Sequence, residues 1–309
     1  MTPTEESTEF RSGFIAVMGF ANVGKSTLVN ALVGTKVSIV SPKPQTTRHR
    51  IMGVLHRPDL QLVFLDTPGI HEPKDRLGDA MMRGARGAVA DVDAVLLLVD
   101  GSRPEAGRGD SRAAKITVAS GAPTILVINK IDLIPAHERE ARIAEYARLG
   151  EFTAVIPVSA LNGWNLDTLM DEILALIPPG GPRYFPEDAF TDRSTGFLAG
   201  ELVREKILLM TREEVPHAVA VTVREIEERP GPLLYIAADI VVERGSQKSI
   251  LIGRGGSMIK KIGEAARLEA EDLLGIRIYL DLFVRVEKGW RDDPGLLGEL
   301  GLSDDPRRS

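Results

Sequence analysis

One stretch decides the fold of this chain: Gly19-Phe20-Ala21-Asn22-Val23-Gly24-Lys25-Ser26-Thr27. It matches the pattern G-x-x-x-x-G-K-[ST], follows an apolar run at 14–18 and opens a helix-length segment at 25–33. Glycines there let backbone N–H groups surround phosphate oxygens, and the helix N-terminus adds unpaired donors and a favourable dipole. The stretch therefore predicts a phosphate-binding loop, in which Lys25 reaches the β- and γ-phosphates and the Ser26 hydroxyl binds Mg²⁺.

Around this loop, short apolar runs alternate with helix-length segments as far as residue 177. Continuous apolar runs suit strands that are buried on both faces of a parallel sheet. The alternation predicts a doubly wound, mostly parallel α/β domain, with an edge strand at 51–57. The apolar runs lie at 14–18, 62–65, 94–99, 124–128 and 154–158, and the helical segments at 25–33, 77–90, 109–120, 137–148 and 166–177.

The pattern ends at Pro178-Pro179-Gly180-Gly181-Pro182, which can neither continue a helix nor lie inside a sheet. The rest predicts a smaller α+β domain of order α-β-β-loop-α-β, with elements at 197–210, 217–227, 233–243, 253–256, 257–274 and 276–286. We therefore expect a flexible leader at 1–11, a nucleotide-binding domain at 12–178, a linker at 179–194, the α+β domain at 195–291 and a tail at 292–309.

Composition narrows the class of protein. The chain has 309 residues, 43% of them hydrophobic and 27% charged, which is ordinary for folded domains. The absence of cysteine excludes disulfides, thiolate zinc sites and a cysteine nucleophile. A net charge of -6 means that any nucleic-acid surface must be local. The acidic, polar N-terminus is unlike a signal peptide, and an intracellular compartment is expected.

Two further motifs follow the apolar runs at 62–65 and 124–128. In the first, Asp66-Thr67-Pro68-Gly69, Asp66 suits a Mg²⁺ contact and the Gly69 N–H could hold the γ-phosphate. In the second, Asn129-Lys130-Ile131-Asp132, the carboxylate of Asp132 can accept hydrogen bonds from guanine N1–H and the N2 amino group. Adenine has no such pair of donors, so Asp132 favours guanine.

Further residues are expected to contact the guanine base. Asn129 can brace the loop and the base, and the stem of Lys130 can lie along the base plane. Ser159-Ala160, after the last apolar run, could give a backbone N–H to guanine O6. All these groups follow strands, and ligands of open α/β sheets bind at the carboxyl edge of the strands.

In order and spacing, Gly19–Thr27, Asp66–Gly69, Asn129–Asp132 and Ser159-Ala160 resemble the G motifs of translational-type GTPases. Pro44-Gln45-Thr46-Thr47-Arg48 resembles the switch I motif of the Era GTPases. The resemblance implies that Gln45, Thr46 and Thr47 lie at the nucleotide, with Thr47 sensing Mg²⁺ and the γ-phosphate. Metal binding then falls to Ser26, Thr47 and Asp66, and catalysis to Lys25, Thr47, Gly69 and Asn22.

Two positions concern the rate of hydrolysis. Ile70 stands where Ras-like proteins carry a glutamine that orients water, so intrinsic hydrolysis should be slow. Asn22 resembles the asparagine that holds K⁺ in related GTPases, where the ion neutralises developing phosphate charge. Asn22 is equally explained as a loop residue that tolerates left-handed φ, and both readings stay open.

In the smaller domain, Gly253-Arg254-Gly255-Gly256 opens a helix, as does the G-x-x-G loop with which KH domains clamp about four nucleotides of RNA. Residues 244–291 hold ten Lys/Arg against six Asp/Glu, a local charge of +4. Lys260 and Lys261 extend the predicted RNA surface along the helix. A solvated helical face is the competing explanation, and the acidic residues at 264, 269, 271 and 272 show that part of it is one.

From about residue 12 to 290 the chain is thus similar to the Era family, a Ras-like G domain followed by a type II KH domain. Phe20-Ala21 replaces the usual Arg-Pro of that family, and Arg254 replaces a lysine. The resemblance implies GTP/GDP and Mg²⁺ as ligands, and binding to the 3′ end of 16S rRNA in 30S subunit assembly. It also implies a cytoplasmic monomer with peripheral association to the cell membrane.

Two other functions compete with this interpretation. A nucleotide-gated RNA or membrane adaptor would hydrolyse GTP only incidentally. A metabolic kinase is disfavoured by Asp132, by Ile70 and by the lack of a substrate-phosphate arginine cluster. The five histidines suggest no other chemistry; each is expected at the surface or satisfied in the core: His49, His56, His71, His137 and His217.

Overall fold

The computed structural model of the chain describes residues 9–70 and 72–302. The described chain divides into two units that interleave along the sequence. The first holds 9–37, 50–70 and 85–192, and the second holds 38–49, 72–84 and 193–302. The start of the predicted leader, His71 and residues 303–309 of the predicted tail lie outside the described residues.

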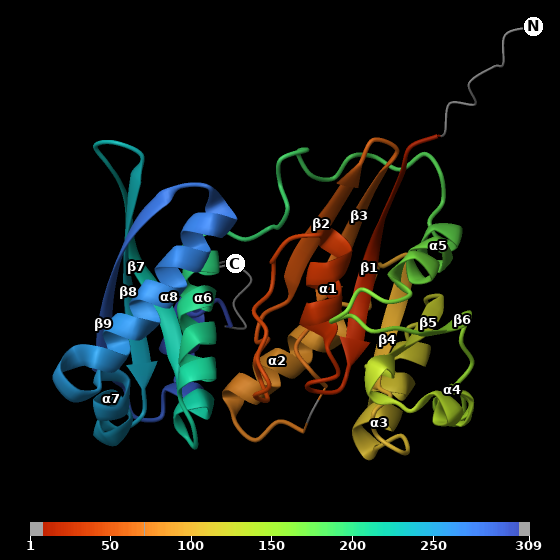
Figure 1. Cartoon of the computed structure of the whole chain (residues 1–309), viewed down its shortest axis with the longest axis horizontal. Helices are drawn as coiled ribbons and strands as arrows, with labels where there is room; N and C mark the ends of the chain where they lie inside the picture. The colour runs from red at the N-terminus through yellow and green to blue at the C-terminus, as the bar shows by residue number, and fades with distance from the viewer. Residues whose placement is uncertain (1–8, 71, 303–309) are drawn as a thin grey trace, which may run out of the picture. The chain divides into compact units, whose positions relative to one another are not determined.

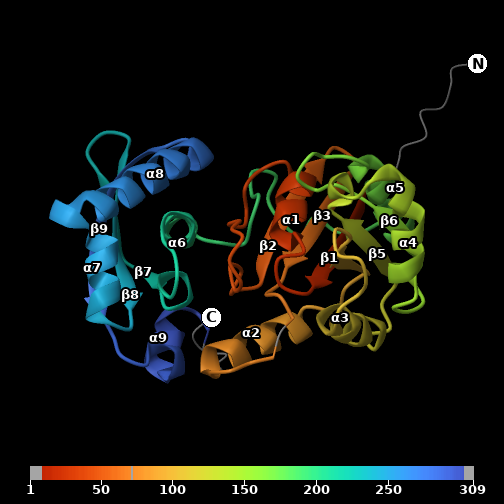
Figure 2. The same ribbon diagram turned by 60° about the horizontal axis from the view of Figure 1, so that its bottom comes forward.

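A six-stranded sheet of order β2-β3-β1-β4-β5-β6 forms the centre of the first unit. All neighbouring pairs are parallel except β2–β3, so 51–57 is the antiparallel edge strand that the sequence predicts. Helices cover both faces, with α1 and α5 on one side and α3 on the other (Figure 2). The strands are β1 (Arg11–Gly19), β2 (Ile51–Arg57), β3 (Leu60–Asp66), β4 (Ala94–Asp100), β5 (Thr124–Asn129) and β6 (Ala154–Pro157); the helices are α1 (Lys25–Val33), α3 (Arg108–Val118), α4 (Arg139–Ala147) and α5 (Leu166–Leu176) (Figure 1).

These elements match the predicted runs, although β1 starts at Arg11, inside the predicted leader. The two short 3-10 turns η1 (Ile131–Leu133) and η2 (Ala136–Glu138) follow β5. Helix α2 (Arg76–Gly87) crosses the boundary of the units, since residues up to 84 group with the second.

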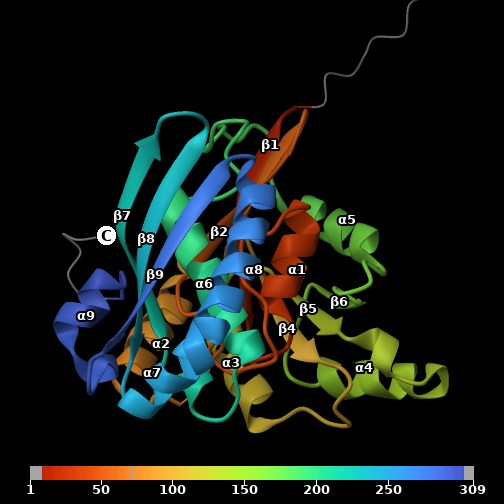
Figure 3. The ribbon, with the colours of Figure 1, turned by 60° about the vertical axis from the view of Figure 1, so that its left-hand side comes forward.

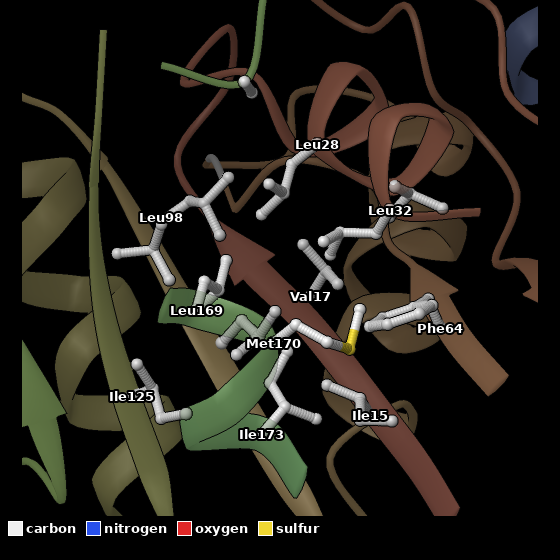
Figure 4. Packing of buried hydrophobic residues seen from close by; sticks show 14 of the residues in the cluster. Ile15, Val17, Leu28, Leu32, Phe64, Leu98, Ile125, Leu169, Met170 and Ile173 are labelled. Atoms are coloured by element: carbon white, nitrogen blue, oxygen red, sulfur yellow. The ribbon is translucent and has the colours of Figure 1, made fainter. Parts of the chain in front are cut away.

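The core of the first unit lies between the sheet and helices α1 and α5. Leu28 and Leu32 of α1 and Leu169, Met170 and Ile173 of α5 point toward strand residues of β1, β3, β4 and β5 (Figure 4). Burying aliphatic side chains such as these stabilises the fold by about 1.5–3 kcal/mol each. The packed face holds α1 rigidly, and with it the phosphate loop that precedes it.

In the second unit, β8 pairs antiparallel with β7 and parallel with β9. Helices α6 and α8 pack together on one face of this three-stranded sheet (Figure 3). Their apolar residues form a second core with Ile236 and Ile240 of β8. The elements are α6 (Thr195–Met210), η3 (Val215–His217), β7 (Ala220–Arg229), β8 (Leu233–Val242), α7 (Gly245–Ile252), η4 (Arg254–Gly256), α8 (Ser257–Leu274), β9 (Arg277–Val286), η5 (Trp290–Asp292) and α9 (Pro294–Glu299).

Helix α7 corrects the predicted order, which placed the glycine loop directly after the second strand. Its sequence lacks apolar residues at helical spacing, so periodicity could not reveal it. The structure shows instead that the start of α7 is capped: Gln247 Oε1 accepts hydrogen bonds from the N–H groups of Glu243 (2.9 Å) and Arg244 (3.0 Å). Helix α9, in the tail, was likewise not predicted. Among the described residues, no helix combines the length and apolar character needed to cross a membrane.

Candidate nucleotide site and nucleic-acid loop

The phosphate loop connects β1 to α1, as the sequence predicts: Gly19 ends the strand and Lys25 begins the helix. Gly19 has φ 151°, and a Cβ atom there would lie 2.4 Å from the Leu98 carbonyl oxygen of β4. No side chain fits at that distance. Glycine is therefore required where the loop leaves the sheet.

Asn129, the last residue of β5, joins two loops of the site. Its Nδ2 donates to the Val23 carbonyl oxygen at 2.9 Å, and its Oδ1 accepts the Ala160 N–H at 3.0 Å. The side chain is buried, so both bonds form away from water. The brace predicted for Asn129 is thus present. A backbone N–H of Ser159-Ala160 was predicted for guanine O6. The Ala160 N–H donates to Asn129 and the Ser159 N–H to the Trp164 carbonyl oxygen at 3.1 Å, so either would have to be shared with the base.

Gly24→Ala is expected to disrupt this brace. Gly24 has φ 102°, and an added Cβ would lie 2.3 Å from Asn129 Nδ2. Displacing the amide breaks two buried hydrogen bonds worth about 1 kcal/mol each, so GDP affinity should fall at least about tenfold. A titration with fluorescent GDP measures the loss.

Gly34→Ala is the matched control. Gly34, the C-cap of α1, has φ 82° and open space around its Cβ position, so it carries the backbone strain without the collision. Equal GDP affinities in the two variants would mean that the Asn129 brace does not support nucleotide binding.

Ser26 and Asp66 meet as expected for a magnesium site. The Ser26 hydroxyl donates to Asp66 Oδ2 at 2.7 Å, and Asp66 is fully buried at the end of β3. Both groups offer oxygen, the donor that Mg²⁺ prefers, and they adjoin the phosphate loop. Among the described residues no three His, Asp or Glu side chains could hold a metal by themselves. Ser26 and Asp66 therefore fit a Mg²⁺ ion that takes further oxygen ligands from the phosphates of the nucleotide.

Lys25 is buried with its Nζ against the phosphate loop. Nζ donates to the carbonyl oxygens of Gly19 (3.3 Å) and Phe20 (3.0 Å). Burial lowers the pKa of Lys25 to about 8, and the carboxylate of Asp66 opposes this shift. Phosphate groups beside Nζ would raise that pKa again, because they favour the charged form.

Nucleotide binding should consequently take up protons at pH 8. Without nucleotide, a lysine of pKa about 8 is half protonated at that pH, and bound phosphates complete its protonation, so uptake is roughly half a proton. Affinity for GDP should fall as pH rises above 8, because the free protein then loses the charge. Calorimetry in buffers of different ionisation enthalpy measures the uptake. Zero uptake or net release at pH 8 would contradict the role of Lys25.

The turn after β3 closes over the phosphate loop. A Cβ atom on Gly69 would lie 2.8 Å from Ala21 Cα, so glycine permits this close approach. The Ile70 N–H donates to the Gly19 carbonyl oxygen at 3.1 Å, and the Ile70 side chain is fully buried. The Thr67 hydroxyl donates to the Val17 carbonyl oxygen at 2.7 Å and so fixes the turn itself.

Asp100, which ends β4, is a site residue that sequence reasoning missed. Its Oδ2 accepts from Lys130 Nζ at 2.7 Å, and Lys130 also donates to the Asn22 carbonyl oxygen at 2.9 Å. Burial alone would raise the pKa of Asp100, but hydrogen bonds from Lys130 and Ser102 bring it below its usual value. Its position at a strand's carboxyl end was the available signal. Asp132 lies exposed in η1, open to a base.

The predicted switch residues lie in the second unit. The Thr46 hydroxyl donates to the Lys43 carbonyl oxygen at 2.7 Å and lies 2.6 Å from Ser41 Oγ, and the Thr46 carbonyl oxygen accepts from Arg204. The Thr46 hydroxyl is therefore engaged inside its own loop, and the role of Thr47 as the sensor stays a prediction. The predicted nucleotide residues of the first unit are Gly19–Thr27, Asp66–Ile70, Asn129–Asp132, Ser159 and Ala160, and those of the second are Gln45, Thr46 and Thr47.

The predicted RNA loop lies between α7 and α8. Gly253 has φ 72°, and a Cβ there would lie 2.8 Å from the Met258 backbone nitrogen, so this glycine is structural. Gly255 (φ 59°) and Gly256 (φ 80°) have open space around them. Arg254, Lys260 and Lys261 are exposed, so they can meet phosphate.

Comparison with known proteins adds two family models and two solved structures. The models are the 50S ribosome-binding GTPases, over residues 14–130, and the KH domain, over residues 214–291. Era in complex with MgGDPNP and nucleotides 1506–1542 of 16S ribosomal RNA is 43% identical, with TM-score 0.90, covering 95% of this chain and 99% of that one. A single-residue variant of Aquifex aeolicus Era bound to GDP·AlF4⁻ is 42% identical, with TM-score 0.89, covering 95% and 100%.

Proposed function

The chain belongs to the Era family of GTPases, and we propose that it hydrolyses GTP and binds the 3′ end of 16S rRNA during assembly of the 30S subunit. One observation carries the proposal. The chain resembles, over 95% of its length, an Era whose solved complex holds both MgGDPNP and 16S rRNA nucleotides. That similarity spans the GTPase fold and the KH fold together.

The residues of the first unit support phosphoryl transfer by positioning and charge. Lys25 brings a buried cation to the phosphates, and Ser26 with Asp66 would hold Mg²⁺. When bound, the ion neutralises charge that develops on the transferred phosphoryl group. We expect the Gly69 N–H to donate a hydrogen bond to the γ-phosphate. Because Ile70 is apolar and fully buried, it cannot orient water, and unassisted hydrolysis should be slow.

The loop at 253–256 supports RNA binding. Its exposed Arg254 and Gly255 precede the first turn of α8, where unpaired N–H groups and the helix dipole favour phosphate. Lys260 and Lys261 continue the positive surface by one turn. The loop therefore offers a close backbone approach with positive charge, the combination by which KH domains clamp single-stranded RNA.

GTP turnover with and without RNA of the 16S 3′ end tests the proposal. We expect RNA to bind and to raise turnover, with RNA of scrambled sequence as the control. The competing adaptor function predicts another outcome: RNA affinity changes between GDP and a GTP analogue, while turnover stays the same with RNA bound. That result would reject the proposal that hydrolysis is the function.

We also propose that K⁺ assists hydrolysis through Asn22. Asn22 has φ 63°, so the conformational explanation holds, and the K⁺ role is proposed in addition to it. Turnover should be roughly tenfold faster in KCl than in NaCl at equal ionic strength, an effect of about 1.4 kcal/mol on the barrier. Asn22→Gly keeps the left-handed backbone without the side chain, so the difference should vanish in that variant. Equal wild-type rates in the two salts would remove the K⁺ role.

Location and assembly state complete the proposal. We propose a cytoplasmic monomer that associates peripherally with the membrane, as the family resemblance implies. Cell fractionation and sedimentation of the purified chain test these two points. Recovery of the chain from membranes only after detergent treatment, or a stable dimer at micromolar concentration, would contradict them.

A further inference from the structure

A cavity of about 200 Å³ lies within the second unit and is lined in part by the segment 38–49, which carries the switch I motif. Its wall includes Arg48 and His49 of that segment, Phe197, Glu201 and Arg204 of α6, and the start of β7. Both arginines are nearly fully buried, at 4% exposed for Arg48 and 2% for Arg204. Buried arginines are rare unless they are paired, so their partners need to be counted.

Arg204 is only partly satisfied. Its Nε donates to Glu201 Oε1 at 2.7 Å, and its Nη2 donates to Glu201 Oε2 at 2.6 Å and to the Thr46 carbonyl oxygen. Its Nη1 is buried and has no hydrogen-bond partner among residues 9–70 and 72–302. The Nη1 edge of this guanidinium therefore keeps N–H donors that make no hydrogen bond.

Arg48 likewise has a buried N–H donor without a hydrogen-bond partner. Its Nη1 donates to the Val219 carbonyl oxygen at 2.7 Å, and the guanidinium lies 5.5 Å from the centre of the Trp290 ring. Its Nε is buried without a partner in the described chain. Burial, and then the charge of Arg204, lower the pKa of Arg48 to about 9. The charge of Arg204 thus acts on Arg48, and the carboxylates of Glu201 and Asp75 oppose this shift only in part.

His49 adds a further donor and corrects an expectation. The sequence placed every histidine at the surface or satisfied in the core, yet both ring nitrogens of His49 are buried and find no partner in the part of the chain described. Its ring lies 5.0 Å from that of Phe197. Burial lowers the pKa of His49 to about 4, so the neutral ring offers one N–H at pH 7.

The charges around the cavity do not balance. Glu201, whose side chain is 13% exposed, already pairs with Arg204. The other carboxylate of the wall, Glu299, is more than half exposed and pairs with Arg285 at 3.1 Å. Two buried cations thus face one partly exposed carboxylate, and several N–H donors remain unused. Leaving such N–H groups unpaired away from water costs free energy. A negatively charged hydrogen-bond acceptor in the cavity would remove that cost.

We propose that this cavity binds one small oxyanion, inorganic phosphate, between Arg48, Arg204 and His49. The planar forks of two arginines match the oxygens of such an ion. About 200 Å³ holds it with a few waters, each of which occupies about 30 Å³. An RNA backbone phosphate carries nucleosides on both sides and cannot reach arginines that are at most 4% exposed. None of the residues that line the cavity is among the predicted nucleotide-binding or RNA-binding residues.

Calorimetric titration of inorganic phosphate into protein saturated with a non-hydrolysable GTP analogue tests the proposal, because the analogue fills the phosphate loop, including the γ-phosphate position. We expect one phosphate per chain. Arg48→Lys keeps the charge but removes the unused Nε donor, so phosphate affinity should fall roughly tenfold. Arg193→Lys is the matched control: Arg193 lies 4.8 Å from the same Phe197 ring but does not line the cavity, and affinity should be unchanged.

Glu201→Gln is expected to change phosphate affinity in the opposite direction. Misfolding cannot produce an increase in affinity. Removing the charge of Glu201 leaves both cations uncompensated, so phosphate should bind roughly tenfold more tightly. AMP, which attaches a nucleoside to the same group, should not compete. Absence of saturable binding, or an affinity that neither Arg48→Lys nor Glu201→Gln changes, would mean that the cavity holds only water. Competition by AMP would overturn the restriction to a small ion.

Discussion

Replacing Asp132 with asparagine is expected to lower GTP affinity by about a hundredfold or more and to create affinity for xanthosine triphosphate. The carboxylate can accept hydrogen bonds from guanine N1–H and the N2 amino group, whereas the amide turns one acceptor into a donor that faces the N2 amino group. Hydrogen bonds to charged groups are worth about 1.5–3 kcal/mol each, and about 1.4 kcal/mol is tenfold in affinity. Competitive titration with both nucleotides measures the change.

The gain of xanthine nucleotide is the internal control for this variant. Xanthine carries an oxygen in place of the N2 amino group, so it can accept from the new amide. Asp132 is exposed in η1, and its replacement should leave the fold intact. Unchanged GTP affinity in Asp132→Asn would show that the guanine base is bound elsewhere.

The double variant Arg254→Asp with Gly255→Asp is expected to abolish RNA binding while GTP binding survives. Two carboxylates would then face the RNA backbone in place of one cation. Loss of each phosphate contact should also reduce the salt dependence by about 0.7 in log–log slope for a single strand. RNA affinity across a salt series, with GTP affinity in the same preparation, measures both effects.

The geometry of the loop makes this variant a fair test. Gly255 has φ 59° and open space around it, a backbone conformation that aspartate tolerates better than most residues. Gly253→Ala is the contrasting control, because its Cβ would lie 2.8 Å from the Met258 backbone nitrogen and should lower stability instead. Retained RNA binding in the double variant would place the RNA surface elsewhere, with the helix from Lys260 as the next candidate.

Much of the fold could be predicted because its signals are local. The apolar runs of β3, β4 and β5 and the start of α1 at Lys25 follow from neighbouring residues alone. Helix α7 escaped because its eight residues carry no helical apolar spacing, and its start depends on the Gln247 side chain. Where local pattern is weak, the contacts made after folding decide the element.

The candidate site divides in the same way. By itself the sequence determined the phosphate loop, the choice of guanine through Asp132 and the glycine loop at 253–256, because those functions need particular residue types at short, fixed spacing. Only the tertiary structure decided that Asn129 holds Val23, 106 residues away, and that Arg204 reaches Thr46 across 158 residues. The physical reason is that burial sets the cost of a charge or an unpaired donor, and burial is a property of the packed chain rather than of any segment.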